Sequence, residues 1–413
     1  MCPPRRRSSS IAGTRHSWET GHPALPGDAH YGGDEACCRY RCARGTSIWE
    51  ATLSVETRPS ALAAEVENAL REFFAGRTEL VDAVGGGYRD AVTTLENFVL
   101  RGGKRVRPAF AWTGWIGAGG DPQGPDAGPV LRACSALELV QACALVHDDI
   151  IDASTTRRGF PTVHVQFEER HRAGSWSGES PHFGEAVAIL LGDLALAWAD
   201  DMIRESGIGP DAAARISPVW SAMRTEVLGG QFLDISNEAR ADESIDAAMR
   251  VNRYKTAAYT IERPLHLGAA LAGAGENLVS AYRRFGTDIG IAFQLRDDLL
   301  GVFGDPAVTG KPSGDDLRAG KRTVLFALAL QRADRDDPGA AAALRGSIGT
   351  DLSDADVDTL RETITSLGAV ADVEKRIGEL VDSALTTLAA STATPEAKQH
   401  LTDMAVAATR RNS

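Results

Sequence analysis

The chain has 413 residues, of which 43% are hydrophobic and 24% are charged, so it can bury a sizeable core. These proportions exclude a collagen, a coiled-coil rod, a disulfide-rich miniprotein and wholesale disorder. The 44 basic residues are outnumbered by 56 acidic ones, and the net charge of −12 argues against a nucleic-acid partner. The longest apolar stretch, Ala186 to Ala199, is too short to span a bilayer, so we expect a soluble protein with no membrane span.

Residues 1–57 are predicted to be an extension without a fold of its own, because no helical or strand period lasts a full turn there. The first 18 residues hold four arginines and no acid, but neither an apolar core nor an amphipathic run of a targeting signal follows. A disordered tail, or a start codon assigned too far upstream, explains the segment better. Four of the six cysteines lie in it without metal-ligand spacing, which favours reduced thiols and a cytoplasmic protein.

Helical signatures begin at Pro59, where Leu62, Val66 and Leu70 recur at helical spacing, and they continue to the C-terminus. Strand alternation and βαβ repeats are absent from the sequence pattern, so one all-α domain is predicted over residues 58–413. Hydroxyl caps mark three further helix starts: Ser217-Pro218, Ser353 with Asp356, and Thr394-Pro395. Loops are expected near residues 118–129, 172–183 and 304–320.

An acidic motif, LVHDDIID at residues 145–152, ends a predicted apolar helix. Asp148 and Asp152 are four residues apart, so both carboxylates lie on one helix face, where they repel unless a cation lies between them. Carboxylates together with phosphate oxygens and water form the usual Mg²⁺ environment. The plain alternative is an exposed acidic helix end.

Basic residues lie on both sides of this motif, which weakens the plain alternative. Arg157 and Arg158 follow it, and RGGKRVRP at residues 101–108 precedes it. Glycine lets backbone N–H groups approach an anion, and arginine pairs with phosphate oxygens. A basic loop and an acidic motif in one chain predict two diphosphates bridged by metal.

A second acidic motif, FQLRDDLLG at residues 293–301, lies on another predicted helix and precedes a glycine-rich segment with Lys311 and Lys321. Between the two motifs, Lys255-Thr256 stands in a helical, mostly apolar segment. A lysine in such a place usually extends to solvent. Anion binding is favoured here, because the chain already needs to hold diphosphate.

The motifs, in this order and spacing, resemble those of the trans-isoprenyl diphosphate synthases of the polyprenyl synthetase family over roughly residues 60–413, and most of all its bacterial geranylgeranyl diphosphate synthases. The resemblance implies an all-α, single-domain helical bundle around a deep central cavity, normally a homodimer. It also implies a Mg²⁺-dependent prenyltransferase, which condenses isopentenyl diphosphate with an allylic diphosphate.

The resemblance assigns a role to each matching residue. Asp148 and Asp152 would hold two of three Mg²⁺ ions, and Asp297 would hold the third. The allylic diphosphate would be bound by Arg157, Lys255, Thr256, Gln294, Lys311 and Lys321. Isopentenyl diphosphate would be bound by Lys104, Arg107, Gln141 and Arg158. Gln141 stands where many members have histidine. Further candidates at the site are Asp149, Gln231, Asp234 and Asp298.

The second motif departs from the family, which usually has aspartate at its last position, here Gly301. Asp305 cannot replace it on a continuing helix, because eight residues at about 100° each leave it about 80° off the face. Asp298 or Asp305 could assist through water. We expect activity to survive, since the first aspartate of the motif is the usual metal contact.

The implied reaction breaks an allylic C–O bond, so it needs no nucleophile triad, and the sequence offers none. Two alternatives stay open: a class I terpene cyclase, whose usual NxxxSxxxE second motif is replaced here by Asp297 and Asp298, and a non-catalytic subunit of a heteromeric prenyl synthase.

The length of the product depends on residues one and two turns before Asp148. Val140, Cys143 and Ala144 lie there, and in the family a bulky aromatic at the last two positions stops growth at fifteen carbons. The small residues here predict a longer product, geranylgeranyl diphosphate, with longer chains as the alternative. They could also simply let two helices pack closely.

Overall fold

The computed structural model describes residues 59–304 and 314–410, and the prediction for residues 1–57 lies outside them. Within the described residues, regular structure is helical apart from a small hairpin of two-residue strands, β1 (Thr156–Arg157) with β2 (Phe160–Pro161), which confirms the all-α class. The first helices are α1 (Pro59–Ala75), α2 (Thr78–Val84), α3 (Tyr88–Leu100), α4 (Val106–Gly117), α5 (Ala127–Ile151), α6 (Val163–Ala173), α7 (Ser180–Arg204) and α8 (Pro210–Ala239). The remaining helices are α9 (Ile245–Val251), η1 (Asn252–Glu262), α10 (Arg263–Ala272), α11 (Glu276–Phe303), α13 (Asp315–Arg318), α14 (Val324–Asp336), α15 (Pro338–Ser347), α16 (Asp354–Ser366), α17 (Ala369–Ala390) and α18 (Pro395–Thr409).

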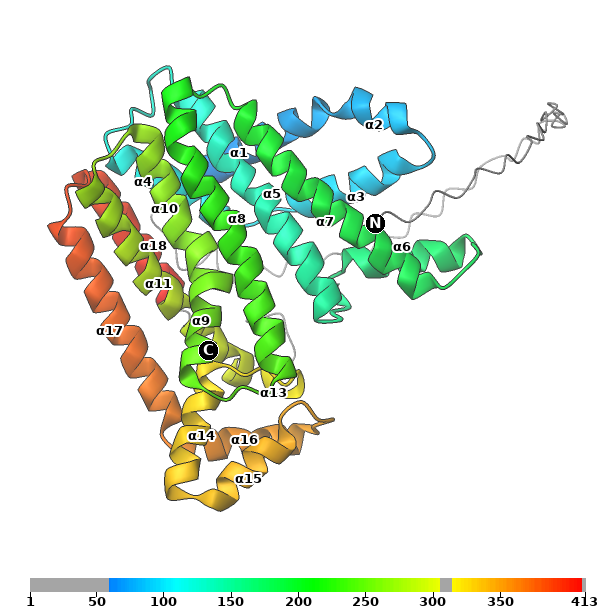
Figure 1. The fold of residues 1–413 in the computed structure, drawn as a ribbon, viewed down its shortest axis with the longest axis vertical. Helices are drawn as coiled ribbons and strands as arrows, with labels where there is room; N and C mark the ends of the chain where they lie inside the picture. The colour runs from blue at the N-terminus through cyan, green and yellow to red at the C-terminus, as the bar shows by residue number, and fades with distance from the viewer. Residues whose placement is uncertain (1–58, 305–313, 411–413) are drawn as a thin grey trace, which may run out of the picture. The chain divides into compact units, whose positions relative to one another are not determined.

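Helix α5 lies at the centre of the largest apolar core and packs along α7, with α4 and α1 also against it (Figure 1). It is long and apolar enough to cross a membrane by length and composition, and 67% of its most apolar window is buried in the structure. The sequence pattern predicted this apolar helix but gave Ala186 to Ala199 as the longest apolar stretch, because Glu138 and Gln141 interrupt the apolar residues of α5. Burial on most sides accounts for its composition, as in the core helix of a globular protein.

Two of the three predicted helix caps are confirmed. Thr394 accepts a hydrogen bond from the backbone of Ala397, and Ser353 forms both bonds of a capping box. The Ser217-Pro218 start is wrong, since Pro218 lies inside α8. Proline there removes one backbone hydrogen bond, but the neighbouring buried side chains hold the helix together through it. The predicted loop at 304–320 is wrong for residues 315–318, which form α13.

Glycines let η1 approach its neighbours almost backbone to backbone. A Cβ atom at Gly290 of α11 would lie 2.5 Å from the Cα of Ala257, and one at Gly230 of α8 would lie 2.2 Å from the backbone nitrogen of Lys255. Asp234 and Gln294 stand one turn after these two glycines, so they share a helix face with them. The wide π-helical turns of η1, common at functional sites, therefore carry their side chains between α8 and α11.

Gly290→Ala should destabilise the protein by about 1–3 kcal/mol, because the added methyl group overlaps the backbone of η1. Gly378→Ala on α17 is the matched control, since a Cβ there meets nothing within 4 Å and alanine favours a helix by about 1 kcal/mol. Urea unfolding at unchanged m-value measures both variants. Equal stability of the two would contradict the close packing of α11 on η1.

Candidate active site

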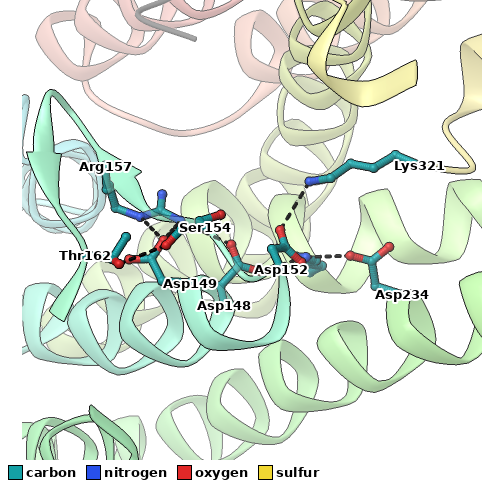
Figure 2. A network of polar contacts seen from close by, with 9 residues as sticks. Asp148, Asp149, Asp152, Ser154, Arg157, Thr162, Asp234 and Lys321 are labelled. Carbon is teal, nitrogen blue, oxygen red and sulfur yellow. Dashed lines mark hydrogen bonds and ion pairs between the residues drawn. The ribbon is translucent and has the colours of Figure 1, made fainter. Parts of the chain in front are cut away.

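The first acidic motif meets two lysines from distant parts of the chain. Asp148 Oδ1 lies 3.0 Å from Lys255 Nζ of η1, and the same ammonium donates to Asp234 of α8. Asp152, the residue directly after α5, lies 3.4 Å from Nζ of Lys321 (Figure 2). The predicted residues of α5, α8, η1 and the segment before α14 are therefore brought together.

These groups remain charged although they are largely buried. Burial by itself would raise the pKa of Asp148, but Lys255, Arg157 and Lys321 outweigh it and the pKa is lowered. Burial would likewise lower the pKa of Lys255, but Asp234 and Asp148 raise it above its usual value. An ionised carboxylate and a protonated amine therefore persist at neutral pH, ready to bind a cation and a phosphate.

Asp149 pairs with an arginine, whereas Asp148 and Asp152 lie beside lysines. It is fully buried and accepts a 2.7 Å hydrogen bond from Nε of Arg157, whose Nη2 also lies 3.4 Å from Asp148. The hairpin that carries Arg157 is closed at its base by a hydrogen bond that Thr162 donates to the carbonyl oxygen of Ser154 (Figure 2). Burial outweighs Arg157 and raises the pKa of Asp149. Asp149 thus orients Arg157 toward the other carboxylates.

The basic loop before α4 is anchored by a buried ion pair that the sequence reasoning did not find. Arg105 Nη1 lies 2.6 Å from Oε2 of Glu138, and both side chains are almost fully buried. Arg107 stacks 4.0 Å above the ring of Tyr259 and donates to Thr260. One feature of the sequence could have indicated this pair: Glu138 is the only acidic residue of α5 before the motif, and a lone acid in an apolar helix needs a partner.

Positive charge accumulates around this loop. Arg158 donates to the carbonyl oxygen of Gly102, and burial together with Arg157, Arg105 and Arg107 lowers its pKa. Within residues 59–304 and 314–410, no carboxylate forms an ion pair with Arg107 or Arg158. Crowded guanidinium groups of this kind favour an anion with several oxygens, such as diphosphate. Lys104 lies exposed in the same loop, and Gln141 lies half-buried two turns before Asp148.

The second acidic motif is joined to η1 by a short chain of hydrogen bonds. Thr256 donates to Gln294 over 2.6 Å, and Gln294 donates to Asp298 over 2.9 Å. Burial raises the pKa of Asp298 to about 7, since Asp316 and Asp297 add to it and Gln294 only partly offsets it. Asp298 therefore faces the protein interior, while Asp297 is only half-buried. Lys311 lies outside the described residues.

The residues present fit a Mg²⁺ ion that is held by one or two carboxylates together with phosphate oxygens and water. In the part of the chain that the structure describes, no three His, Cys, Asp or Glu side chains converge on one point. Mg²⁺ in phosphate sites usually takes one or two carboxylates and completes its shell with phosphate oxygens and water. Asp148 and Asp152, each beside an ammonium group, already stand where positive charge is favoured. Mg²⁺ with diphosphate would satisfy the same carboxylates.

The residues predicted to limit the product do not all share one face. Val140 and Cys143 are each 2% exposed, while Ala144 is half-buried and lies one turn before Asp148. Cys143 instead lies 3.8 Å from the ring of His147, which faces α7. Ala144 is therefore the residue that shares the face of the acidic motif. On α8, Gln231 precedes Asp234 by one turn, and its amide nitrogen is buried without a hydrogen-bond partner among the described residues.

Comparisons with known proteins agree with this geometry. The profile of the family described as polyprenyl synthetase matches residues 91–364. A geranylfarnesyl diphosphate synthase of Aeropyrum pernix is 34% identical over 70% of this chain and 83% of its own length. A geranylgeranyl diphosphate synthase of Mycobacterium tuberculosis is 33% identical over 71% and 77%. The crystal structure of geranylgeranyl pyrophosphate synthase from Corynebacterium glutamicum, complexed with isoprenyl diphosphate and magnesium, is 49% identical, with a TM-score of 0.82 over 86% of this chain and 100% of that one.

Proposed function

Because the chain belongs to the polyprenyl synthetase family and is an isoprenyl diphosphate synthase, we propose that it condenses isopentenyl diphosphate with an allylic diphosphate to give geranylgeranyl diphosphate. The observation that carries the proposal is the pairing of two different charge environments. One is the group of carboxylates and lysines around Asp148, and the other is the group of arginines around Arg107 and Arg158. Two diphosphates need two such places.

The allylic diphosphate is proposed to bind at the carboxylate side. Asp148, Asp152 and Asp297 would hold three Mg²⁺ ions, which supply Lewis-acid stabilisation of the charge on the departing diphosphate. The other groups proposed for this diphosphate are Arg157, Lys255, Thr256, Gln294, Lys311 and Lys321. Lys255 and Arg157 support this assignment, because both already face Asp148.

Isopentenyl diphosphate is proposed to bind at the arginine side, through Lys104, Arg107, Gln141 and Arg158. Arg107 is held in place by Tyr259 and Thr260, so little conformational entropy is lost when it binds an anion. The reaction then breaks the allylic C–O bond, joins the resulting carbocation to the double bond of isopentenyl diphosphate, and loses a proton. Cations fixed beside the diphosphate stabilise the charge that develops on it.

Asp148→Ala should lower kcat by about a hundredfold or more, because it removes charge stabilisation at the departing diphosphate. The assay uses the purified chain alone with Mg²⁺, isopentenyl diphosphate and each allylic starter, and identifies products by mass. Asp403→Ala, at an exposed carboxylate of α18, is the control and should behave as wild type. Near wild-type turnover of Asp148→Ala at saturating Mg²⁺ would remove this residue from the site.

The same assay addresses the rival functions. A non-catalytic subunit of a heteromeric synthase would form no product alone, whereas the assembled carboxylate and lysine groups support a competent enzyme. A terpene cyclase would release a hydrocarbon from an allylic diphosphate without isopentenyl diphosphate. The second group of cations, which a cyclase does not need, favours condensation.

Product length is proposed to depend on the segment of α5 before the first motif, which holds Val140, Cys143 and Ala144, and within it chiefly on Ala144, which shares a face with Asp148. Ala144→Phe should shorten the product toward farnesyl diphosphate, because the ring projects from the same face as Asp148. Cys143→Phe is the comparison: its side chain points toward α7, so it should chiefly destabilise the fold by overpacking. Mass analysis of the products measures the chain length. An active Ala144→Phe enzyme that still makes the wild-type product would refute the proposed role of Ala144 in limiting that length.

A homodimer is proposed from the exposed apolar residues of α7 and α8. Leu190 of α7 is 67% exposed and Phe232 of α8 is 66% exposed, and further exposed apolar residues on these helices are Ile189, Leu228 and Ile235. Asp200 joins the two helices by accepting hydrogen bonds from Trp220 and Arg224. An apolar patch of this kind on a folded chain is typical of a subunit interface.

Phe232→Glu should therefore dissociate the dimer, because it would bury a carboxylate in an apolar interface. Light scattering should give twice the mass of the 43.8 kDa chain for the wild type and a single mass for the variant. Leu80→Glu on α2, at a side chain that is 64% exposed, is the control and should remain dimeric. A monomeric wild type would rule out this interface.

We also propose that residues 58–413 form one catalytic domain, which the family match over residues 91–364 supports. The cytoplasm is the proposed location. Cys134 and Cys143 are free and buried, which suits a reducing compartment.

A further inference from the structure

The space beside Gly301, the last residue of the second acidic motif, is filled by a carboxylate from another segment. A Cβ atom at Gly301 would lie 1.9 Å from Oδ2 of Asp316 and 2.4 Å from its Cγ. No side chain at position 301 could coexist with Asp316 in this position. Asp316 belongs to the short helix α13, which follows the glycine-rich segment.

This position has a specific relation to the motif. Gly301 follows Asp297 by four residues in the continuous helix α11, so the two share one helix face. The carboxylate of Asp316 therefore lies where the side chain of an aspartate at position 301 would begin. It reaches that face from outside the helix rather than from the helix itself.

Two further observations tie this place to the rest of the site. Asp298 is 4% exposed, and its Oδ2 has no hydrogen-bond partner within the described residues. Lys321 lies 3.4 Å from Asp152 and is attracted electrostatically by Asp316 as well. Asp316 thus stands between the second motif and the lysine that contacts the first motif.

We propose that Asp316 supplies the carboxylate that the second motif lacks at Gly301, and that it helps to hold the Mg²⁺ bound by Asp297. The inference rests on the proposed function, because it assigns a residue to the same metal site. Gly301 and Asp316 then form a coupled pair, because the absence of a side chain at Gly301 leaves the space that the carboxylate of Asp316 occupies. A direct or a water-bridged carboxylate contact would serve equally to orient the ion.

The test measures metal binding rather than turnover. Mg²⁺ is titrated by calorimetry into the full-length chain in the presence of inorganic diphosphate. Asp316→Asn, which keeps the shape and removes the charge, should weaken Mg²⁺ binding by about 10–100-fold. Asp315→Asn, one residue earlier in α13, is the matched control and should bind as the wild type does. Unchanged binding by a folded Asp316→Asn variant would overturn the proposal.

Reciprocal substitution separates a metal role from a merely structural one. Gly301→Asp alone should weaken Mg²⁺ binding, because the new side chain collides with Asp316. Combining Gly301→Asp with Asp316→Gly should recover most of the loss, since one carboxylate is again present without a clash. Such strong non-additivity is expected only of groups that share one place. A double variant no better than Gly301→Asp would contradict the exchange.

Failure of this inference can be told apart from failure of the proposed function. Wild-type condensation of isopentenyl diphosphate with an allylic starter tests the function on its own. If the wild type condenses its substrates and Asp316→Asn still binds Mg²⁺ normally, only the role of Asp316 is wrong. If the wild type makes no product and Asp148→Ala does not alter Mg²⁺ binding, the metal site itself is wrong.

Discussion

Lys255 lies between Asp148 and Asp234, and the site depends on this mutual neutralisation of buried charges. Removing either sign from water is costly unless an opposite charge stands close by. In this structure the ammonium groups of Lys255 and Lys321 lie beside Asp148 and Asp152. Diphosphate with Mg²⁺ carries the same kinds of charge, so its binding can exchange partners without leaving a group unpaired. The site is thereby kept ionised and ready for an anion with its metal.

Close packing of the helices makes that neutralisation possible. Gly230 and Gly290 allow α8 and α11 to approach the backbone of η1, and the residues one turn later are Asp234 and Gln294. Each then reaches a partner on η1: Asp234 binds Lys255, and Gln294 accepts from Thr256. A wider helix spacing would leave these polar side chains apart and partly buried without partners, at a cost in stability. The glycines therefore serve the site as much as the core.

The arginine side of the site is organised differently, by anchoring rather than by neutralisation. Arg105 is neutralised by Glu138 and fixes the basic loop to α5. Arg107 is oriented by an aromatic ring and a hydroxyl group, neither of which cancels its charge. The two arginines thus differ in role: Arg105 anchors the start of α4, and Arg107, two residues later, is the group proposed to bind an anion. This arrangement also places a cationic region next to an acidic one, as a reaction between two diphosphates requires.

The sequence by itself determined the helical class, the order of the motifs and most of the charged residues, because helical spacing and charge pattern are local properties. It could not show that Arg105 is an anchor while Arg107 remains available, since both are arginines of one basic motif and only their distant partners differ. The sequence likewise placed Cys143 and Ala144 together, whereas the helix directs them to different neighbours. For Gly301 the sequence showed only a missing carboxylate. The tertiary structure placed Asp316 there, because a contact between residues 15 positions apart depends on how the chain returns, and no local pattern encodes that return.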